Sequence, residues 1–439
     1  CCSSLAAADL DYREVTLENG LRVILLREDR APVVVVQVWY HVGSVDEVEG
    51  KTGLAHMLEH MMFQGTKKLA PEEFARIVAR NGGVDNAATS HDFTYYYIKL
   101  GSDRLELALS LEADRMRDLL LRPEKFKSEN QVVREERRMR NESTPAARMA
   151  EAFQAAAYRV HPYGRPVIGW MEDIQKFTVT DLVAFYQKYY APNNATLIIA
   201  GDFAFATAEA LVRQHFAPLP RNPDLQRPRP PVEPPPDAVR LLYVLDAETR
   251  VPVWRAGFLV PTLGSSPAGR DAHALALAGN VLGGGSASRL YRRLVTQEKL
   301  AVSVQVDYAD LERDPCLLTI HVTPAKGASL ARLEAVVGEE VTRLQREPVP
   351  DRELTRTQNA MIAEHTYNRD SIHALAAHIG QAVTSGVDWK EVLIHYPERI
   401  RAVTAADIQK VAERHLSPQR WVVGVLLPIP TPKPKKMPL

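Results

Sequence analysis

Length, composition and charge narrow the class of protein to which this chain can belong. The chain has 439 residues, which is long for a single hydrophobic core, so two or three domains are expected. Lysine plus arginine and aspartate plus glutamate each total 54, and no apolar run approaches the roughly 20 residues of a membrane-spanning helix, so neither nucleic-acid binding nor a membrane span is expected.

The first residues and the cysteines bear on the compartment of the protein. Residues 1–8 have the small-residue character of the end of a signal peptide, with a cleavage site after Ala8. This pattern predicts export to a bacterial periplasm, and lipid attachment at Cys1 or Cys2 is the alternative. Apart from those two, the chain has only Cys316, so neither a disulfide framework nor a cysteine-based zinc site is expected.

Two β-rich runs precede a predicted helix. Residues 21–26 and 33–42 flank a polar turn that ends at Pro32, which predicts a β-hairpin. Residues 53–65 are apolar over most of their helical surface, with Thr52 suited to cap the start and Gly65 to end it. They predict a buried helix of about three turns.

Three polar side chains interrupt this apolar helix. His56, Glu59 and His60 share one side, because positions i, i+3 and i+4 are neighbours on a helix. Unpaired buried polar groups cost roughly a few kcal/mol each, and a zinc ion held by the two imidazoles would satisfy them. The order His-x-x-Glu-His is the reverse of the commoner His-Glu-x-x-His zinc helix. Capped core histidines or a surface pair are the alternative.

The next elements are interpreted as a scaffold around this helix. Pro71 opens a packing helix, and residues 103–120 have the apolar spacing of another. Between them, residues 86–98 change from small polar residues into an aromatic strand, whose tyrosines are interpreted as core and sheet packing. The small residues at its start, Asn86 and Ala87, would let a substrate backbone approach, as in peptide binding by strand addition.

A third zinc ligand is expected on the helix at residues 129–139, which carries three glutamates. Val132 and Val133 are taken as its buried face, and Glu129 and Glu136 lie within a turn on either side of them. Glu135 projects about 100° away from Glu136. Helical periodicity therefore predicts Glu136 as the inward ligand, with Glu129 on the same stripe.

The chain divides into two halves that echo each other. Residues 217–238 contain nine prolines and predict a stiff extended linker. Residues 178–192 match residues 404–418 at constant separation, and each match is followed by a strand, which indicates a tandem duplication. The predicted parts are a signal-peptide remnant or flexible N-terminus (1–9), a zinc-binding catalytic domain (10–220), a proline-rich linker (221–238), a second homologous domain without the zinc motif (239–428) and a disordered tail (429–439).

Together these motifs resemble the pitrilysin family of zinc peptidases, specifically its short bacterial members and the zinc-binding subunit of the mitochondrial processing peptidase. The resemblance covers nearly the whole chain. The stretches that carry it are His56-x-x-Glu59-His60, Glu136 within residues 132–140, Asn86-Ala87, His161-Pro162-Tyr163-Gly164 and Ile168-Gly169-Trp170.

The resemblance implies an α+β fold of two homologous α/β domains, each a mostly antiparallel sheet flanked by helices, arranged as a clam shell. It implies one zinc ion per chain, bound by His56, His60 and Glu136, with Glu129 supporting the ligands. The expected activity is hydrolysis of short or unfolded peptides by a zinc-bound water that Glu59 activates as a base. The alternative is a non-catalytic zinc-stabilised assembly or peptide-binding subunit, against which the retention of Glu59 argues.

The resemblance also implies a partner. Family members that act alone resemble one another in a second-domain arginine followed seven residues later by a tyrosine, but Val295 and Val302 occupy these places here. We therefore expect a heterodimer in which a homologous zinc-less subunit supplies the arginine and tyrosine; a homodimer is the alternative. A shifted alignment, with Arg292 or Arg293 and Tyr308 substituting, or an enzyme that works without the pair, also remains open.

Overall fold

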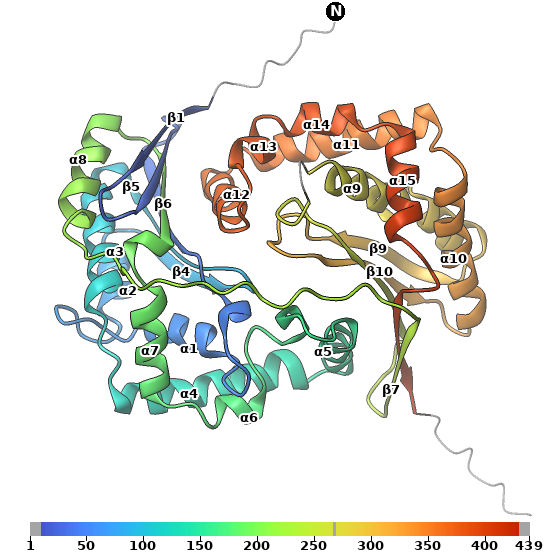
Figure 1. The fold of residues 1–439 in the computed structure, drawn as a ribbon, viewed down its shortest axis with the longest axis horizontal. Coiled ribbons are helices and arrows are strands. Elements are labelled where there is room, and N and C mark those ends of the chain that lie inside the picture. Colours follow the sequence, from blue (N-terminus) through green and yellow to red (C-terminus); the bar gives the residue numbers. More distant parts are fainter. Residues whose placement is uncertain (1–9, 267–268, 430–439) are drawn as a thin grey trace, which may run out of the picture.

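Each half of the chain is built on one β-sheet, within the residues 10–266 and 269–429 that the computed structural model describes (Figure 1). The predicted N-terminal remnant, residues 1–9, and all but the first residue of the predicted tail lie outside these residues. Within them, no helix combines the length and the apolar character that crossing a membrane requires.

From residue 10 onwards, where the description begins, the first half contains six strands and eight α-helices. Its strands are β1 (Asp11–Thr16), β2 (Arg22–Arg27), β3 (Val33–Tyr40), β4 (Val84–Thr89), β5 (Thr94–Gly101) and β6 (Ala195–Gly201). Its helices are α1 (Leu54–Met61), α2 (Glu73–Arg80), α3 (Leu105–Asp118), α4 (Pro123–Arg137), α5 (Pro145–Ala157), α6 (Met171–Ile174), α7 (Val179–Tyr189) and α8 (Phe205–Phe216).

The first sheet has the strand order β1-β2-β6-β3-β5-β4, and only the β2–β6 pair is parallel. The predicted hairpin of residues 21–42 is wrong, because β6 lies between β2 and β3 and pairs with both. The sequence around residues 21–42 could not predict that β6 lies between these strands, because β6 follows β3 by more than 150 residues. Strand β4 is an edge strand, so one side of its backbone is open to another chain.

The second half repeats this plan. Its strands are β7 (Arg240–Asp246), β8 (Val253–Val260), β9 (Ala301–Tyr308), β10 (Cys316–Pro324) and β11 (Val422–Pro428), in the order β7-β11-β8-β10-β9. Its helices are α9 (Arg270–Gly283), α10 (Leu330–Arg346), α11 (Asp351–Asn368), α12 (Ile372–Thr384), α13 (Trp389–Leu393), α14 (Tyr396–Ala402) and α15 (Ala405–His415). Only β7 and β11 are parallel, as β2 and β6 are in the first sheet. The predicted α+β fold of two homologous domains is confirmed.

The duplicated stretch folds identically in both halves. Thr178 begins α7 and Thr404 begins α15, and each threonine forms a capping box with an aspartate three residues later. Each helix leads through a short connection into the strand that pairs in parallel, β6 or β11. The tandem duplication therefore extends from local capping to sheet topology.

The two halves exchange helices. From the first half, α5 packs Met149 and Phe153 against Val422 and Leu426 of the second sheet. From the second half, α12 packs on the face of the first sheet that is turned towards the second half (Figure 1), where Gly380 lies against the ring of Trp39. The domain limits 10–220 and 239–428 therefore remain a prediction, because each half supplies part of the other's core.

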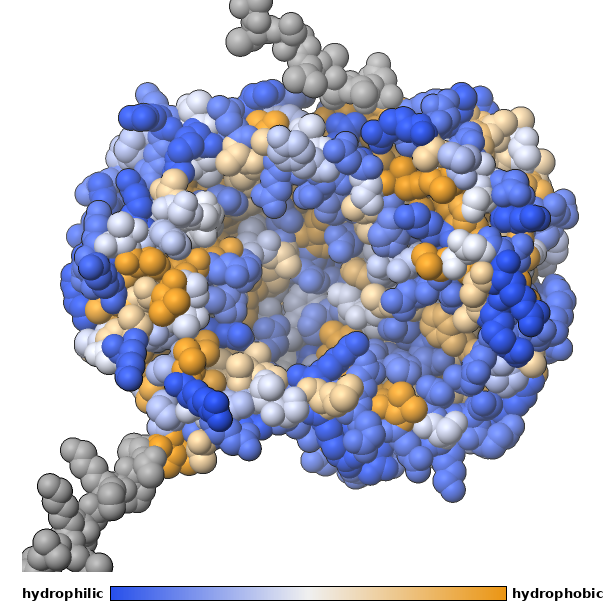
Figure 2. Space-filling view, turned by 180° about the vertical axis from the view of Figure 1, so that it is seen from behind, coloured by the Kyte–Doolittle hydropathy of each residue, from blue (hydrophilic) through white to orange (hydrophobic). Residues whose placement is uncertain are grey.

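The two halves form the predicted clam shell. Figure 2 shows the molecule from behind, where the face is mostly hydrophilic and is hollowed between the halves. The proline-rich linker crosses from one half to the other as an extended segment (Figure 1).

Candidate active site and metal centre

Helix α1 carries the His-x-x-Glu-His motif and begins in an unpredicted way. Thr52 does not cap it: the Thr52 hydroxyl donates to Asp173 Oδ2 at 2.7 Å. The carboxylate of Glu47 instead accepts the backbone N–H groups of Gly53 and Ala55, each at 2.8 Å. A carboxylate at this end satisfies orphan donors and complements the helix dipole. The helix ends at Met61, before the predicted Gly65.

His56, His60 and Glu136 converge as the motif predicts. The Nε2 atom of His60 lies 3.1 Å from Glu136 Oε2, and His56 Nε2 lies 3.7 Å from the same oxygen. Each residue offers one ligand atom, and the three atoms lie within 4.8 Å of one another. Among the described residues, this is the only group of at least three histidine, cysteine or acidic side chains placed to hold a metal ion. Two imidazoles and one carboxylate match the protein ligands found in catalytic zinc sites.

Helix α4 presents Glu129 and Glu136 to α1 and turns Glu135 away. Glu129 Oε2 lies 3.3 Å from His60 Nδ1, and Gln64 donates to the other Glu129 oxygen at 2.9 Å. Glu135 is 68% exposed and pairs with Arg138. The periodicity argument therefore selects the same two carboxylates as the geometry, although only Val133 is buried and Val132 is 49% exposed.

The pKa values of the two histidines are shifted in opposite directions. Burial, reinforced by the neighbouring His60, lowers the pKa of His56 to about 4, so this imidazole is neutral. Burial also opposes the charged form of His60, but hydrogen bonds to Glu129 and Glu136 raise the pKa of His60 to about 9. The hydrogen bond from His60 lowers the pKa of Glu136. A metal ion would therefore replace a proton held between His60 and Glu136.

Glu59 lies beside the ligand group without belonging to it. The hydroxyl of Thr89, at the end of β4, donates to Glu59 Oε2. Burial raises the pKa of the Glu59 carboxyl, which is the direction expected for a general base. Thr89 was not singled out by the sequence; only its position on the strand that faces α1 reveals it.

A cavity of about 450 Å³ joins these groups to the edge strand. It is lined by residues of α1, α4 and β4, among them Glu59, Asn86 and Ala87, and by Arg140, which follows α4. Arg140 was also missed by the sequence reasoning, and its guanidinium pairs with Glu136 Oε1 at 2.8 Å. The backbone N–H of Ala87 donates to the Asn86 side chain at 2.9 Å rather than to β5, so this N–H belongs to the open edge.

The second half has no polar side chain at the two positions where the resemblance leads us to look for an arginine and a tyrosine. Val295 packs against the second core, and Val302 is 65% exposed on β9. Two of the three possible substitutes are engaged elsewhere: Tyr308 donates to the Pro261 carbonyl, and Arg293 pairs with three glutamates, Glu298, Glu339 and Glu340.

Comparison with known proteins agrees with this geometry. The model of the insulinase family, peptidase family M16, matches residues 22–170, and the model of the peptidase M16 inactive domain matches residues 176–361. This chain belongs to peptidase family M16. The first match contains the ligand group, and the second covers most of the half that lacks it. The predicted resemblance to the pitrilysin family and its short bacterial members is thereby confirmed.

Relatives and solved structures span most of the chain. The zinc protease PqqE of Helicobacter pylori is 36% identical over 337 residues, which cover 76% of this chain and 74% of that protein. A protease from Helicobacter pylori has a crystal structure with a TM-score of 0.89 and 31% identity, covering 95% of this chain and 100% of that chain. A probable mitochondrial-processing peptidase subunit beta of Arabidopsis thaliana is 26% identical, covering 95% of this chain and 79% of that protein. The family and these names support a peptidase.

Proposed function

We propose that this chain is a zinc-dependent endopeptidase that hydrolyses short or unfolded peptides. The observation that carries the proposal is the convergence of His56, His60 and Glu136 beside an unligated carboxylate, Glu59, in one open cavity. A purely structural zinc site is closed by four ligands and needs no such carboxylate. We assign one zinc ion per chain to the three converging side chains.

The side chains around the ion have distinct roles. Zinc supplies Lewis acidity when bound and favours ionisation of water. Glu129 holds His60 through Nδ1, so His60 Nε2, which lies 3.1 Å from Glu136 Oε2, is the nitrogen that would bind zinc. Glu59 is the base: Thr89 occupies its Oε2, so Oε1 is the oxygen that takes a proton from water and returns it to the leaving amine.

The substrate is proposed to bind as an added strand along β4. The outward N–H of Ala87 is available if the Asn86 side chain moves aside, and both residues line the cavity that contains Glu59. Recognition through the backbone requires an extended segment and is nearly independent of side chains. This favours short or unfolded peptides over folded proteins.

Metal removal tests this proposal. Chelator-treated chain should lose cleavage of an unfolded peptide and regain it as one equivalent of zinc per chain is added back. The Glu135→Gln variant, altered on the exposed face of α4, should behave like the wild type. Cleavage that persists in metal-free protein would overturn the zinc mechanism.

We further propose that a homologous zinc-less subunit completes the active site, with a homodimer as the alternative. The support is the engagement of Arg293 and Tyr308 in other contacts and the aliphatic side chains at Val295 and Val302, which cannot hydrogen-bond a substrate or an oxyanion. Purified alone, the chain should bind zinc but cleave poorly, and the partner should raise turnover without changing the zinc content. Full activity of the isolated chain, unchanged by any homologous subunit, would refute this.

The proposed compartment is the bacterial periplasm. Besides the sequence of residues 1–8, the support is a fold shared with the first half of the periplasmic protease PqqL of Escherichia coli, with a TM-score of 0.79 and 20% identity, covering 95% of this chain and 92% of that chain. Fractionation of the native host would place the protein in the periplasmic extract, or in the membrane fraction if Cys1 or Cys2 carries lipid. Recovery in the cytoplasm would contradict the proposal.

A further inference from the structure

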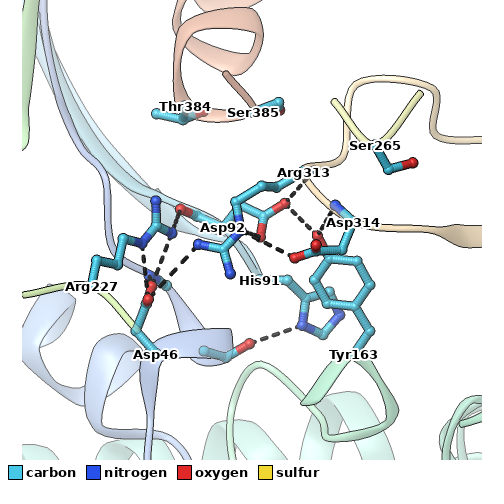
Figure 3. Close-up of polar contacts among 12 residues, drawn as sticks. Asp46, His91, Asp92, Tyr163, Arg227, Ser265, Arg313, Asp314, Thr384 and Ser385 are labelled. Carbon is cyan, nitrogen blue, oxygen red and sulfur yellow. Dashed lines mark hydrogen bonds and ion pairs between the residues drawn. The ribbon is translucent and has the colours of Figure 1, made fainter. Parts of the chain in front are cut away.

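A cluster of polar side chains joins the linker and the second half to the first half (Figure 3). Arg227, from the proline-rich linker, binds Asp46 through two parallel contacts, Nε to Oδ1 and Nη2 to Oδ2, each at 2.9 Å. The same Nη2 donates to the backbone carbonyl of Asp92 at 2.7 Å. The side chain of Asp46 is 1% exposed, so this bidentate pair is largely shielded from water.

The first partner of Arg227, Asp46, leads directly to the zinc-binding helix. Asp46 closes a short 3-10 helix (Ser44–Asp46) and accepts the N–H of Gly43 at 3.0 Å. The next residue, Glu47, accepts the N–H groups of Gly53 and Ala55 at the start of α1. The position of Asp46 therefore sets the position of Glu47, which fixes where α1 begins and where Glu59 lies.

The second partner, Asp92, leads to the other support of Glu59. Asp92 lies in the turn between β4 and β5. Two residues earlier, the carbonyl of Ser90 accepts the backbone N–H of Ser44 at 3.1 Å. Val45 likewise donates to the His91 carbonyl at 3.0 Å. Thr89, immediately before this turn, donates its hydroxyl to Glu59. The Arg227 guanidinium thus adds a link, beside these two backbone hydrogen bonds, between the two loops that place Glu59 and its hydrogen-bond donor.

The second half reinforces the same turn. The backbone N–H of Arg313, in the loop before β10, donates to Asp92 Oδ2 at 2.9 Å, and Tyr163 donates to that oxygen at 2.6 Å. The Arg313 guanidinium lies 3.9 Å from both Asp46 Oδ1 and Asp92 Oδ1. The half without the metal motif therefore contacts the loops behind the active site rather than the zinc cavity.

We propose that Arg227 is a positioning residue for Glu59. By holding Asp46 against the carbonyl of Asp92, it fixes the separation between α1 and Thr89 and thereby the orientation of the Glu59 carboxylate. This inference rests on the proposed role of Glu59 as base. It gives the linker a function in catalysis beyond connecting two domains.

Arg227 is not needed to attach the linker. Before it, the N–H of Asn222 donates to Asn193 Oδ1 at 2.8 Å. After it, the Glu233 carboxylate accepts the N–H groups of Arg159, Val160 and His161 at 2.7, 2.9 and 3.0 Å. Removing the guanidinium should therefore leave the linker in place, while Asp46 keeps the Gly43 N–H at 3.0 Å and the Arg313 guanidinium at 3.9 Å as partners.

The experiment compares Arg227→Gln with Arg229→Gln, an exposed arginine of the same linker, in zinc-loaded enzyme together with any subunit that activity requires. Arg227→Gln should lower kcat by about 10- to 100-fold, the loss typical of a misplaced catalytic group, with KM and zinc content unchanged. Arg227→Lys should restore only part of the rate, because an ammonium cannot form the bidentate pair. In a Glu59→Gln background, Arg227→Gln should lower kcat by less than about twofold, because the two residues act as one unit.

Hydrogen exchange supplies a readout that does not depend on activity. Amides of residues 43–55 and 89–93 should exchange faster in Arg227→Gln than in the wild type or Arg229→Gln. Unchanged exchange, an unchanged kcat, or an equal loss of kcat in both Glu59 backgrounds would overturn the positioning role. A wild-type enzyme without peptidase activity would instead refute the proposed function, and the exchange result would still show whether Arg227 holds the two loops.

Discussion

The glutamates of α4 allow a graded test of the metal site. Glu136 Oε2 lies 3.1 and 3.7 Å from the Nε2 atoms of His60 and His56, so Glu136→Gln removes the carboxylate proposed as a direct ligand. Glu129 contacts the proposed ligands through His60 Nδ1, at 3.3 Å. Glu135 is 68% exposed and faces Arg138. The three substitutions remove the same charge from the same helix, so their differences report on geometry.

The expected losses follow from these contacts. Replacing a group that supports a metal ligand typically costs about 10- to 100-fold in affinity, roughly 1.4–2.7 kcal/mol, which we expect for Glu129→Gln. Glu136→Gln should cost more than about 100-fold, and Glu135→Gln should leave the affinity unchanged. Competition with a chromophoric zinc chelator measures all three, and circular dichroism checks that each variant is folded. Equal losses in Glu135→Gln and Glu136→Gln, or a larger loss in Glu129→Gln, would refute the assignment of Glu136 as ligand.

Three further predictions concern the strand edge, the contact between halves and the acidic loop behind the site. Ala87→Pro removes the outward N–H of β4 and should raise KM by about 2- to 10-fold without zinc loss, the range for one hydrogen bond; an unchanged KM would exclude strand addition at this residue. Gly380→Ala would bring a Cβ within 2.0 Å of the Trp39 ring and should lower the free energy of unfolding by about 1–3 kcal/mol in chemical denaturation. The control is Gly338→Ala, where the ring of Trp421 lies 4.0 Å from the added Cβ, and it should be neutral or stabilising. Equal effects at both glycines would contradict the packing of α12. Burial and the nearby Asp92 raise the pKa of Glu312 to about 8. The contribution of Glu312 to the free energy of unfolding is therefore complete below about pH 4.5 and is lost as the pH rises through 8. Relative to Glu312→Gln, the free energy of unfolding of the wild type should therefore fall by at most about 1.4 kcal/mol per pH unit over that window. If the free energies of unfolding of the two proteins change in parallel with pH, Glu312 is ionised in the fold.

The residues of the candidate metal site could be predicted from sequence because their placement depends on helical periodicity. His56, Glu59 and His60 share a face through spacing alone, and Glu136 was separated from Glu135 by one step of about 100°. The duplication was visible because Thr178 and Thr404 begin helices by the same capping box. These features are local, and local spacing survives in the folded protein.

The features that sequence missed depend on contacts between distant segments. The hairpin was predicted wrongly because β6 inserts between two strands that are neighbours in the chain. Thr52 was taken as the cap of α1, whereas Glu47 reaches its first N–H groups from a preceding loop. Arg227 was hidden in a linker defined by its prolines, and its partner Asp46 is distant in sequence. No periodicity connects such residues, so only the three-dimensional arrangement reveals them.

The most direct test of the central claim is the turnover of zinc-loaded Glu59→Gln beside the zinc-loaded wild type, measured with any partner subunit that the wild type requires. Glu59 contacts Thr89 and lies outside the group of three ligands, so the variant should keep one zinc per chain. Its kcat should fall by at least about 100-fold, because general-base catalysis typically contributes that much or more. Near-normal cleavage by a variant with full zinc content would contradict the assignment of Glu59 as the base and the mechanism built on it.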